Sequence, residues 1–258
     1  MKAIVLALVV MGTAFLPGLP PAHSLEKRIV ATGLSPCPAS QEAPEATGTV
    51  NVGVSCDNDF AVYLGTCCTV TNATFVGASS CNVTNACVRH GQAYTITGIT
   101  GSSYLYIVAW SDSATAQGLL VSVGPGPVSS TPPSQILGGD PRWQVYATSL
   151  TFPGSPPTTT DNTTAPTKKF EKFLNAQLDI ACSSNLWTTP TNGGTNASGN
   201  NVAGGGALEP PVTVVDPNAL WMWFQSGKAA CAGTQSPFSP GCNHNEYLIF
   251  RLPLSYIH

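Results

Sequence analysis

The chain has 258 residues, a net charge of −3 and only 9% charged residues, against about 25% in ordinary soluble domains. The few Lys and Arg residues form no long basic run, which excludes an electrostatic basis for nucleic-acid binding. The length suffices for one large or two small cores, and single all-β domains commonly reach it.

Residues 1–24 have the pattern of a secretory signal peptide. Lys2 precedes a mostly apolar run that ends at Leu16, and Ala22-His23-Ser24 has the small-x-small form of a cleavage site. The run is shorter than the ~20 residues needed to cross a bilayer, so we favour cleavage over a membrane anchor. We therefore expect a secreted, extracellular protein without a membrane span after cleavage.

The middle of the chain alternates apolar and polar residues with the period of β-strands. Before it, residues 25–46 lack any period and are predicted to be poorly structured. Val50 to Cys56 predict a half-buried strand, which the turn formers Asp57-Asn58-Asp59 join to a second strand as a hairpin. Further strands are predicted at residues 73–78, 93–97, 104–110, 118–123 and 143–152. The strand at 104–110 is apolar on both faces, which predicts a central strand covered on both sides.

The second half of the chain is less regular. Residues 153–167 are rich in Pro and Thr and residues 188–206 in Gly and Asn, so both are predicted to be loop insertions. Apolar residues at helical spacing predict one helix over 167–180. The strands at 220–224 and 246–251 are predicted to form a closing hairpin. Together these elements predict one all-β domain over residues 47–258, an antiparallel sandwich with long loops and at most one or two short helices.

All nine cysteines follow the predicted cleavage site, and an oxidising compartment favours disulfides. Structural zinc is the competing interpretation, and the absence of paired C-x2-C motifs disfavours it. Cys231 and Cys242 flank a compact Pro/Gly turn and are predicted to bond to each other. Cys67 and Cys68 are predicted to bond to Cys81 and Cys87. The odd count leaves one thiol that is free or joins a partner chain.

Four triplets fit the N-x-Ser/Thr pattern of N-glycosylation, which supports the secretory route. Each is predicted to mark a surface position. The acceptors are Asn72, Asn82, Asn162 and Asn196.

Candidate ligand-binding residues gather at two predicted strand ends: Asp57, Asn58, Asp59, Trp110 and Asp112. Oxygen atoms of Asp57 and Asp59 suit calcium, although the favoured interpretation is a turn capped by its own side chains. No other cofactor is expected. A Gly-x-Ser-x-Gly nucleophile motif is absent from the sequence, and no spacing selects a pair of glycosidase carboxylates. The sequence therefore predicts a protein that is not an enzyme.

Residues 57–65 resemble the D-N-x-F-x-L-Y-V-N-G hairpin of galactose-binding-like jelly-roll domains of extracellular proteins. Residues 104–112 are similar to the apolar strand that follows in such domains, and residues 219–223 with 247–251 to their closing strand pair. The cysteine-rich 67–87 loop and the Thr/Pro-rich insertion depart from the pattern. The resemblance implies a jelly roll that binds carbohydrate or a surface, often without catalysis.

Our leading hypothesis is a secreted, disulfide-bonded glycoprotein that serves as a non-catalytic binding or adhesion module. Its expected partner is an extracellular glycan or a component of a cell surface or wall. The alternative is a structural subunit of an extracellular coat, wall or filament, self-associated through the unpaired cysteine. A secreted hydrolase is the third and least favoured hypothesis.

Overall fold

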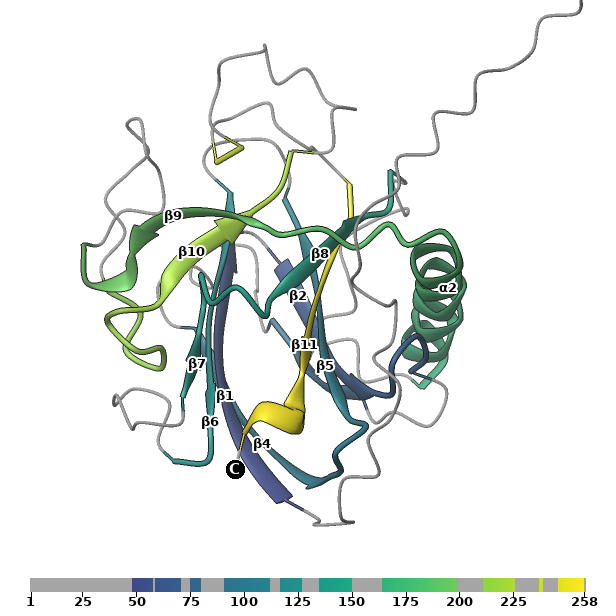
Figure 1. Ribbon diagram of the computed structural model, residues 1–258, viewed down its shortest axis with the longest axis horizontal. Helices are drawn as coiled ribbons and strands as arrows, with labels where there is room; N and C mark the ends of the chain where they lie inside the picture. The colour runs from purple at the N-terminus through teal and green to yellow at the C-terminus, as the bar shows by residue number, and fades with distance from the viewer. Residues whose placement is uncertain are drawn as a thin grey trace, which may run out of the picture. The chain divides into compact units, whose positions relative to one another are not determined.

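The computed structural model describes residues 48–57, 59–70, 75–79, 91–111, 117–126, 135–149, 164–198, 211–225, 237–238 and 246–257. All of them lie within one compact unit, Leu34–His258. Two antiparallel sheets and one long helix make up this part of the chain (Figure 1). The predicted all-β antiparallel sandwich is thereby confirmed, while its jelly-roll topology stays a prediction.

Sheet A has the strand order β4-β1-β6-β10-β9, and β7 pairs with β6. Its strands are β1 (Gly48–Asp57), β4 (Gln92–Ile99), β6 (Gly118–Gly124), β7 (Ile136–Leu137), β9 (Thr191–Thr195) and β10 (Leu220–Trp223). Sheet B has the order β3-β2-β5-β11-β8. Its strands are β2 (Asp59–Gly65), β3 (Phe75–Ala78), β5 (Tyr104–Trp110), β8 (Gln144–Ala147) and β11 (Leu248–Pro253). Helix α2 (Thr164–Ser183) and the short 3-10 helices η1 (Asn196–Ser198) and η2 (Leu254–Tyr256) complete the described elements.

The main core joins apolar side chains from both sheets. Because side chains alternate along a strand, every second residue of a strand faces the opposite sheet. In the core cluster, β1 contributes Val50, Val52 and Val54, and β5 contributes Leu105 and Ile107. Each such side chain, removed from water, stabilises the fold by roughly 1.5–3 kcal/mol.

Helix α2 covers the outer face of sheet B and forms a second core cluster. Phe170, Leu174 and Leu178 of the helix pack with Tyr106 and Val108, the residues of β5 that point away from sheet A. β5 is therefore buried on both faces, as its sequence predicts. The helix begins earlier and ends later than predicted.

The segment 211–219 covers part of the outer face of sheet A. The Asp216 N–H donates to Ser122 Oγ over 3.3 Å, and Ser122 lies on β6 among residues that face away from sheet B. This cover explains why β1 is buried on both faces from Val52 to Asp57. The prediction of a half-buried strand is correct only for the first residues of β1.

The two predicted hairpins are wrong. β1 lies in sheet A and β2 in sheet B, so Asp57 and Asp59 flank a crossing between sheets and not a hairpin turn. β10 and β11 likewise belong to different sheets. Alternation in the sequence shows that each strand has one face in the core. It does not show whether the next strand along the chain pairs with it in the same sheet or lies in the opposite sheet.

Part of the predicted 188–206 loop is regular structure. Residues 191–195 form β9, which pairs with β10 at the edge of sheet A, and η1 follows directly. Residues 199–206 and 153–163 lie outside the described residues. None of the described helices is both long and apolar enough to cross a membrane.

The disulfide of Cys68 differs from the prediction. Cys68 is bonded to Cys182 at the end of α2, so neither Cys81 nor Cys87 is its partner. Cys67 is disulfide-bonded as well. The predicted Cys231–Cys242 bond lies outside the described residues.

The free thiol of the described chain is Cys56, which is fully buried in the core. Because the folded chain encloses it, Cys56 cannot bond to a partner chain. Self-association through an unpaired cysteine therefore stays a prediction that cannot involve Cys56, and the cysteines at positions 37, 81, 87, 231 and 242 lie outside the described residues.

Candidate functional site

Asp59 and Trp110 lie side by side at one end of sheet B. They are register partners at the start of β2 and the end of β5, so their side chains share the outer face of the sheet. Ser79 follows β3 at the same end, and its N–H donates to Phe60 O over 2.9 Å. We call Asp59, Ser79 and Trp110 the strand-end site. The predicted candidates Asn58 and Asp112 lie outside the described residues.

The carboxylate of Asp59 is held by a neighbouring strand. Ser79 Oγ donates to Asp59 Oδ1 over 2.9 Å, and Phe60 N–H donates to the same hydroxyl oxygen over 3.3 Å. The hydrogen bond from Ser79 orients the Asp59 carboxylate at this end of the sheet.

Trp110 has an indole that combines apolar and polar surface. The side chain is partly exposed and packs against the second core cluster. Its Nε1 atom is buried, and no hydrogen-bond acceptor for it lies among the described residues. Trp187 and Trp223 share that property, but Arg251 stacks on Trp187 and Trp223 is fully buried in the core. Only Trp110 combines the unpaired N–H with a place beside Asp59.

Asp57 lies on a different face from Asp59. It pairs with Gly118 and belongs to the residues of β1 that point away from sheet B, whereas Asp59 points away from sheet A. Calcium needs about six to eight oxygen ligands around one point. The described residues include no group of three or more His, Cys, Asp or Glu side chains suited to a metal ion. The predicted calcium site stays a prediction that this geometry does not support.

Cys56 directly precedes Asp57 and is fully buried in the core. Burial raises the pKa of its thiol well above the usual range, and the negative charges of Asp57 and Asp59 raise it further. A hydrogen bond with the Trp110 backbone opposes this pKa shift. Since the thiolate is the nucleophilic form, Cys56 is kept neutral and inert.

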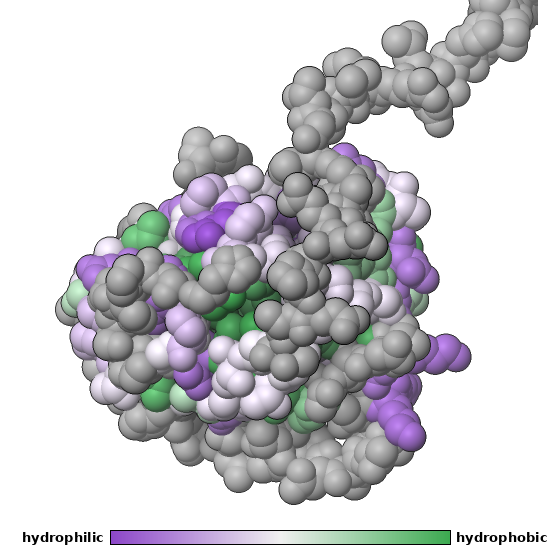
Figure 2. Space-filling view, turned by 60° about the horizontal axis from the view of Figure 1, so that its bottom comes forward, coloured by the Kyte–Doolittle hydropathy of each residue, from purple (hydrophilic) through white to green (hydrophobic). Residues whose placement is uncertain are grey.

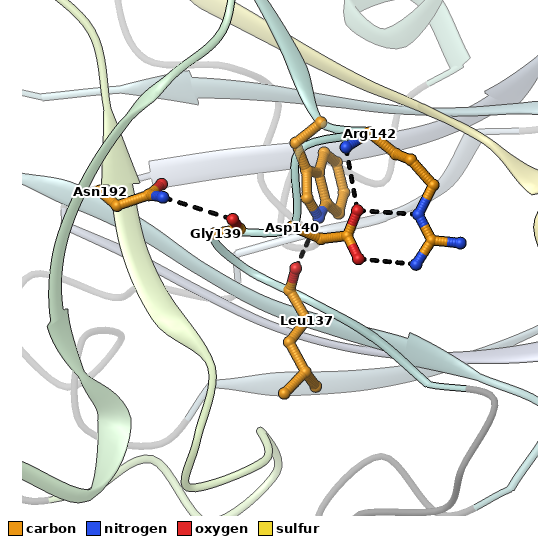
Figure 3. Close-up of polar contacts among 6 residues, drawn as sticks. Leu137, Gly139, Asp140, Arg142 and Asn192 are labelled. Atoms are coloured by element: carbon orange, nitrogen blue, oxygen red, sulfur yellow. Dashed lines mark hydrogen bonds and ion pairs between the residues drawn. The ribbon is translucent and has the colours of Figure 1, made fainter.

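A second polar surface, which the sequence did not indicate, forms around Arg142 (Figure 3). Arg142 Nε donates to Asp140 Oδ1 over 2.8 Å and Nη2 to Oδ2 over 2.6 Å. These bonds are the main cause of the lowered pKa of Asp140. The guanidinium also stacks over the ring of Tyr256, 5.3 Å from its centroid, and Tyr256 is 53% exposed. We call Asp140, Arg142 and Tyr256 the Arg142 surface.

The backbone of the Arg142 surface needs glycine at position 139. Gly139 has φ +89°, and a Cβ there would lie 2.6 Å from a side-chain carbon of Leu220. The Trp143 indole N–H donates to Leu137 O over 3.0 Å, and Asn192 Nδ2 donates to Gly139 O over 3.3 Å (Figure 3). These bonds hold the turn in place. The side chains of Asp140 and Arg142 use most of their hydrogen-bonding capacity on each other.

The chain as a whole carries few charges, since only 9% of its residues are charged. In Figure 2 much of the described surface is pale, the colour of residues of intermediate hydropathy. Hydrophobic residues show in the centre of that face and strongly hydrophilic ones toward its edges.

Comparison with protein-family models, curated proteins and solved structures finds no match to this chain.

Proposed function

We propose that this protein is a secreted, disulfide-bonded glycoprotein that binds carbohydrate on a cell surface or wall without catalysis, through the strand-end site. The observation that carries the proposal is the indole N–H of Trp110, buried and without an acceptor among the described residues, beside the Asp59 carboxylate. An unpaired buried donor costs about 1–3 kcal/mol. The N–H is closed to solvent in the free protein, so a ligand oxygen that accepts from it does so after a shift of the indole on binding, and the hydrogen bond then removes that cost.

The chemistry of a sugar matches these groups. A pyranose presents C–H groups to an aromatic ring and hydroxyls at its rim. The Trp110 ring offers the apolar face, its N–H offers a donor, and Asp59 offers an acceptor already oriented by Ser79. A few fixed polar groups beside an apolar surface are typical of small-ligand sites.

The disulfides support the secretory compartment. The Cys68–Cys182 bond and the bonded Cys67 are expected in an oxidising environment and are rare in the cytosol. They agree with the signal-peptide pattern of residues 1–24.

A glycan array probed with the secreted protein tests the proposal. Trp110→Phe keeps an aromatic ring and removes the N–H, and Asp59→Asn keeps the shape and removes the charge. We expect each to weaken binding about tenfold, because one charged or buried hydrogen bond contributes about 1.4 kcal/mol or more. Tyr256→Ala, on the Arg142 surface, is the matched control and should bind like the wild type.

Two results would contradict the proposal. One is a wild-type protein that binds no glycan on the array. The other is a loss of binding in Tyr256→Ala without a loss in Trp110→Phe, which would place the ligand on the Arg142 surface.

A further inference from the structure

Three cysteine sulfurs meet where helix α2 ends against sheet B. Cys67 and Cys68 lie in the tight turn after β2, closed by a hydrogen bond of 2.9 Å from Thr66 N to Thr69 O. Cys182, in the last turn of α2, is bonded to Cys68. The Sγ atoms of Cys67 and Cys68 are 3.7 Å apart, although each takes part in a different disulfide.

A buried arginine stands beside two of the three sulfurs. Arg251 Nη1 is 3.9 Å from Cys67 Sγ and 3.8 Å from Cys182 Sγ. Gln144 Oε1 accepts from Arg251 Nε over 2.7 Å, and the Trp187 ring lies 3.9 Å from the guanidinium carbon. These contacts fix the guanidinium, which is only 2% exposed as a residue. Burial lowers the pKa of Arg251, but arginine stays protonated in proteins.

Cys68 is fixed separately from its neighbours. Its N–H donates to the Tyr106 hydroxyl over 2.9 Å, and that hydroxyl donates to Thr66 O over 2.6 Å. The backbone of Cys68 has φ +90°, in the left-handed region that favours glycine. The turn therefore holds the Cys68 sulfur in a set position, bonded to Cys182 and 3.7 Å from Cys67 Sγ.

The positions of the sulfurs match the parts of a thiol–disulfide exchange. A thiolate attacks one sulfur of a disulfide and expels the other as a thiolate, and exchange is faster when the leaving thiolate is stabilised. A nearby guanidinium stabilises thiolates. The Arg251 guanidinium lies next to Cys67, whose thiolate would attack the disulfide, and next to Cys182, whose thiolate would leave it.

We propose that Cys67, Cys68 and Cys182 form an exchange centre in which Arg251 stabilises the attacking and leaving thiolates. An external thiolate first attacks the sulfur of the cysteine that is bonded to Cys67, forms a mixed disulfide with that cysteine and releases the Cys67 thiolate. This thiolate attacks Cys68 Sγ, so that a Cys67–Cys68 bond forms and the Cys68–Cys182 bond breaks. Cys182 takes the electron pair and remains as a thiolate beside Arg251. The second step needs no further reductant, and it frees the end of α2 from its covalent link to the turn.

Partial reduction with glutathione, quenched with N-ethylmaleimide and mapped by mass spectrometry without further reduction, tests the centre. We expect the first modified species of the wild type to carry the label on Cys182 and an intact Cys67–Cys68 bond within one peptide. In Cys67→Ser, at the same glutathione concentration, Cys182 should remain bonded to Cys68 and unlabelled.

Arg251→Gln separates the exchange from simple reduction. The Arg251→Gln variant should label Cys182 about tenfold more slowly than the wild type, or slower still. Arg251→Lys, which keeps a positive charge, should restore part of the rate. Circular dichroism shows whether both variants fold. Three results overturn the proposal: label on Cys67 with Cys68–Cys182 intact, label on Cys68 and Cys182 together, or labelling of Cys182 only when the protein unfolds.

Discussion

Asn196 holds residues 212–219 in place with a single side chain. Its Oδ1 accepts from Val212 N–H over 2.7 Å, and its Nδ2 donates to the carbonyl oxygens of Val212, Val215 and Asp216 over 2.9 to 3.3 Å. The residue is 2% exposed. The expected surface position of this glycosylation acceptor is therefore wrong. Asn72, Asn82 and Asn162 lie outside the described residues.

Asn196→Ala is expected to lower the free energy of unfolding by about 2–4 kcal/mol, because several buried backbone groups lose their partner at once. Asn192→Ala is the control, since Asn192 is exposed and makes one bond of 3.3 Å. Urea denaturation measures both variants. Equal stability of the two would show that the buried amide does not organise this segment.

The same hydrogen bonds predict that Asn196 carries no glycan in the folded protein. A sugar on Nδ2 would replace one of its protons and would have to fit in a buried site. Mass spectrometry of the secreted protein should find the peptide with Asn196 unmodified, and Ser198→Ala, which removes the acceptor triplet, should leave the glycan mass unchanged. A glycan at this position in stable, folded protein would contradict the structure.

At the scale of elements, helix α2 stabilises the sandwich by covering the aromatic outer face of sheet B. Leu174 is fully buried in that contact, and Asn175 Oδ1 accepts from Val70 N–H over 2.7 Å. Leu174→Ala should lower the free energy of unfolding by about 2–5 kcal/mol. Ile180→Ala, at a position 45% exposed, should change it by about 0.5 kcal/mol or less. Equal effects in thermal or urea unfolding would mean that the helix does not pack as described.

The strands were predictable because their signals are local. β5 is apolar at every position and is buried on both faces. Its apolar run alone therefore predicted both the strand and its interior place in the sheet. β9 was missed because its sequence, Thr-Asn-Gly-Gly-Thr, has no apolar alternation. It is a strand because the edge of β10 pairs with it, which is a tertiary effect.

Contacts between residues far apart in the sequence were not predictable. Cys68 bonds across 114 residues to Cys182, whereas proximity along the chain favoured Cys81 and Cys87. Turn and strand-end patterns predict Asp59 and Trp110 as separate candidates, and only the strand register shows that the two are neighbours. The Arg142 surface was missed because its aromatic member, Tyr256, lies far from Arg142 in the sequence.

At the scale of the whole molecule, one covalent bond links the described layers. Cys68 follows β2 of sheet B and Cys182 ends α2, so their disulfide fastens the helix to the sheet that it covers. Cys56 remains a buried thiol in the core between the sheets. The sandwich and its helical cover thus specify that Cys68 and Cys182 are bonded and that Cys56 is a thiol.

Disulfide mapping of the native protein, digested without reduction, tests this assignment of bonded and free sulfurs most directly. The account predicts a peptide pair joined through Cys68 and Cys182, and a Cys56 thiol that reacts with maleimide only after denaturation. A bond from Cys68 to Cys81 or Cys87, or a Cys56 that reacts in the native protein, would contradict it.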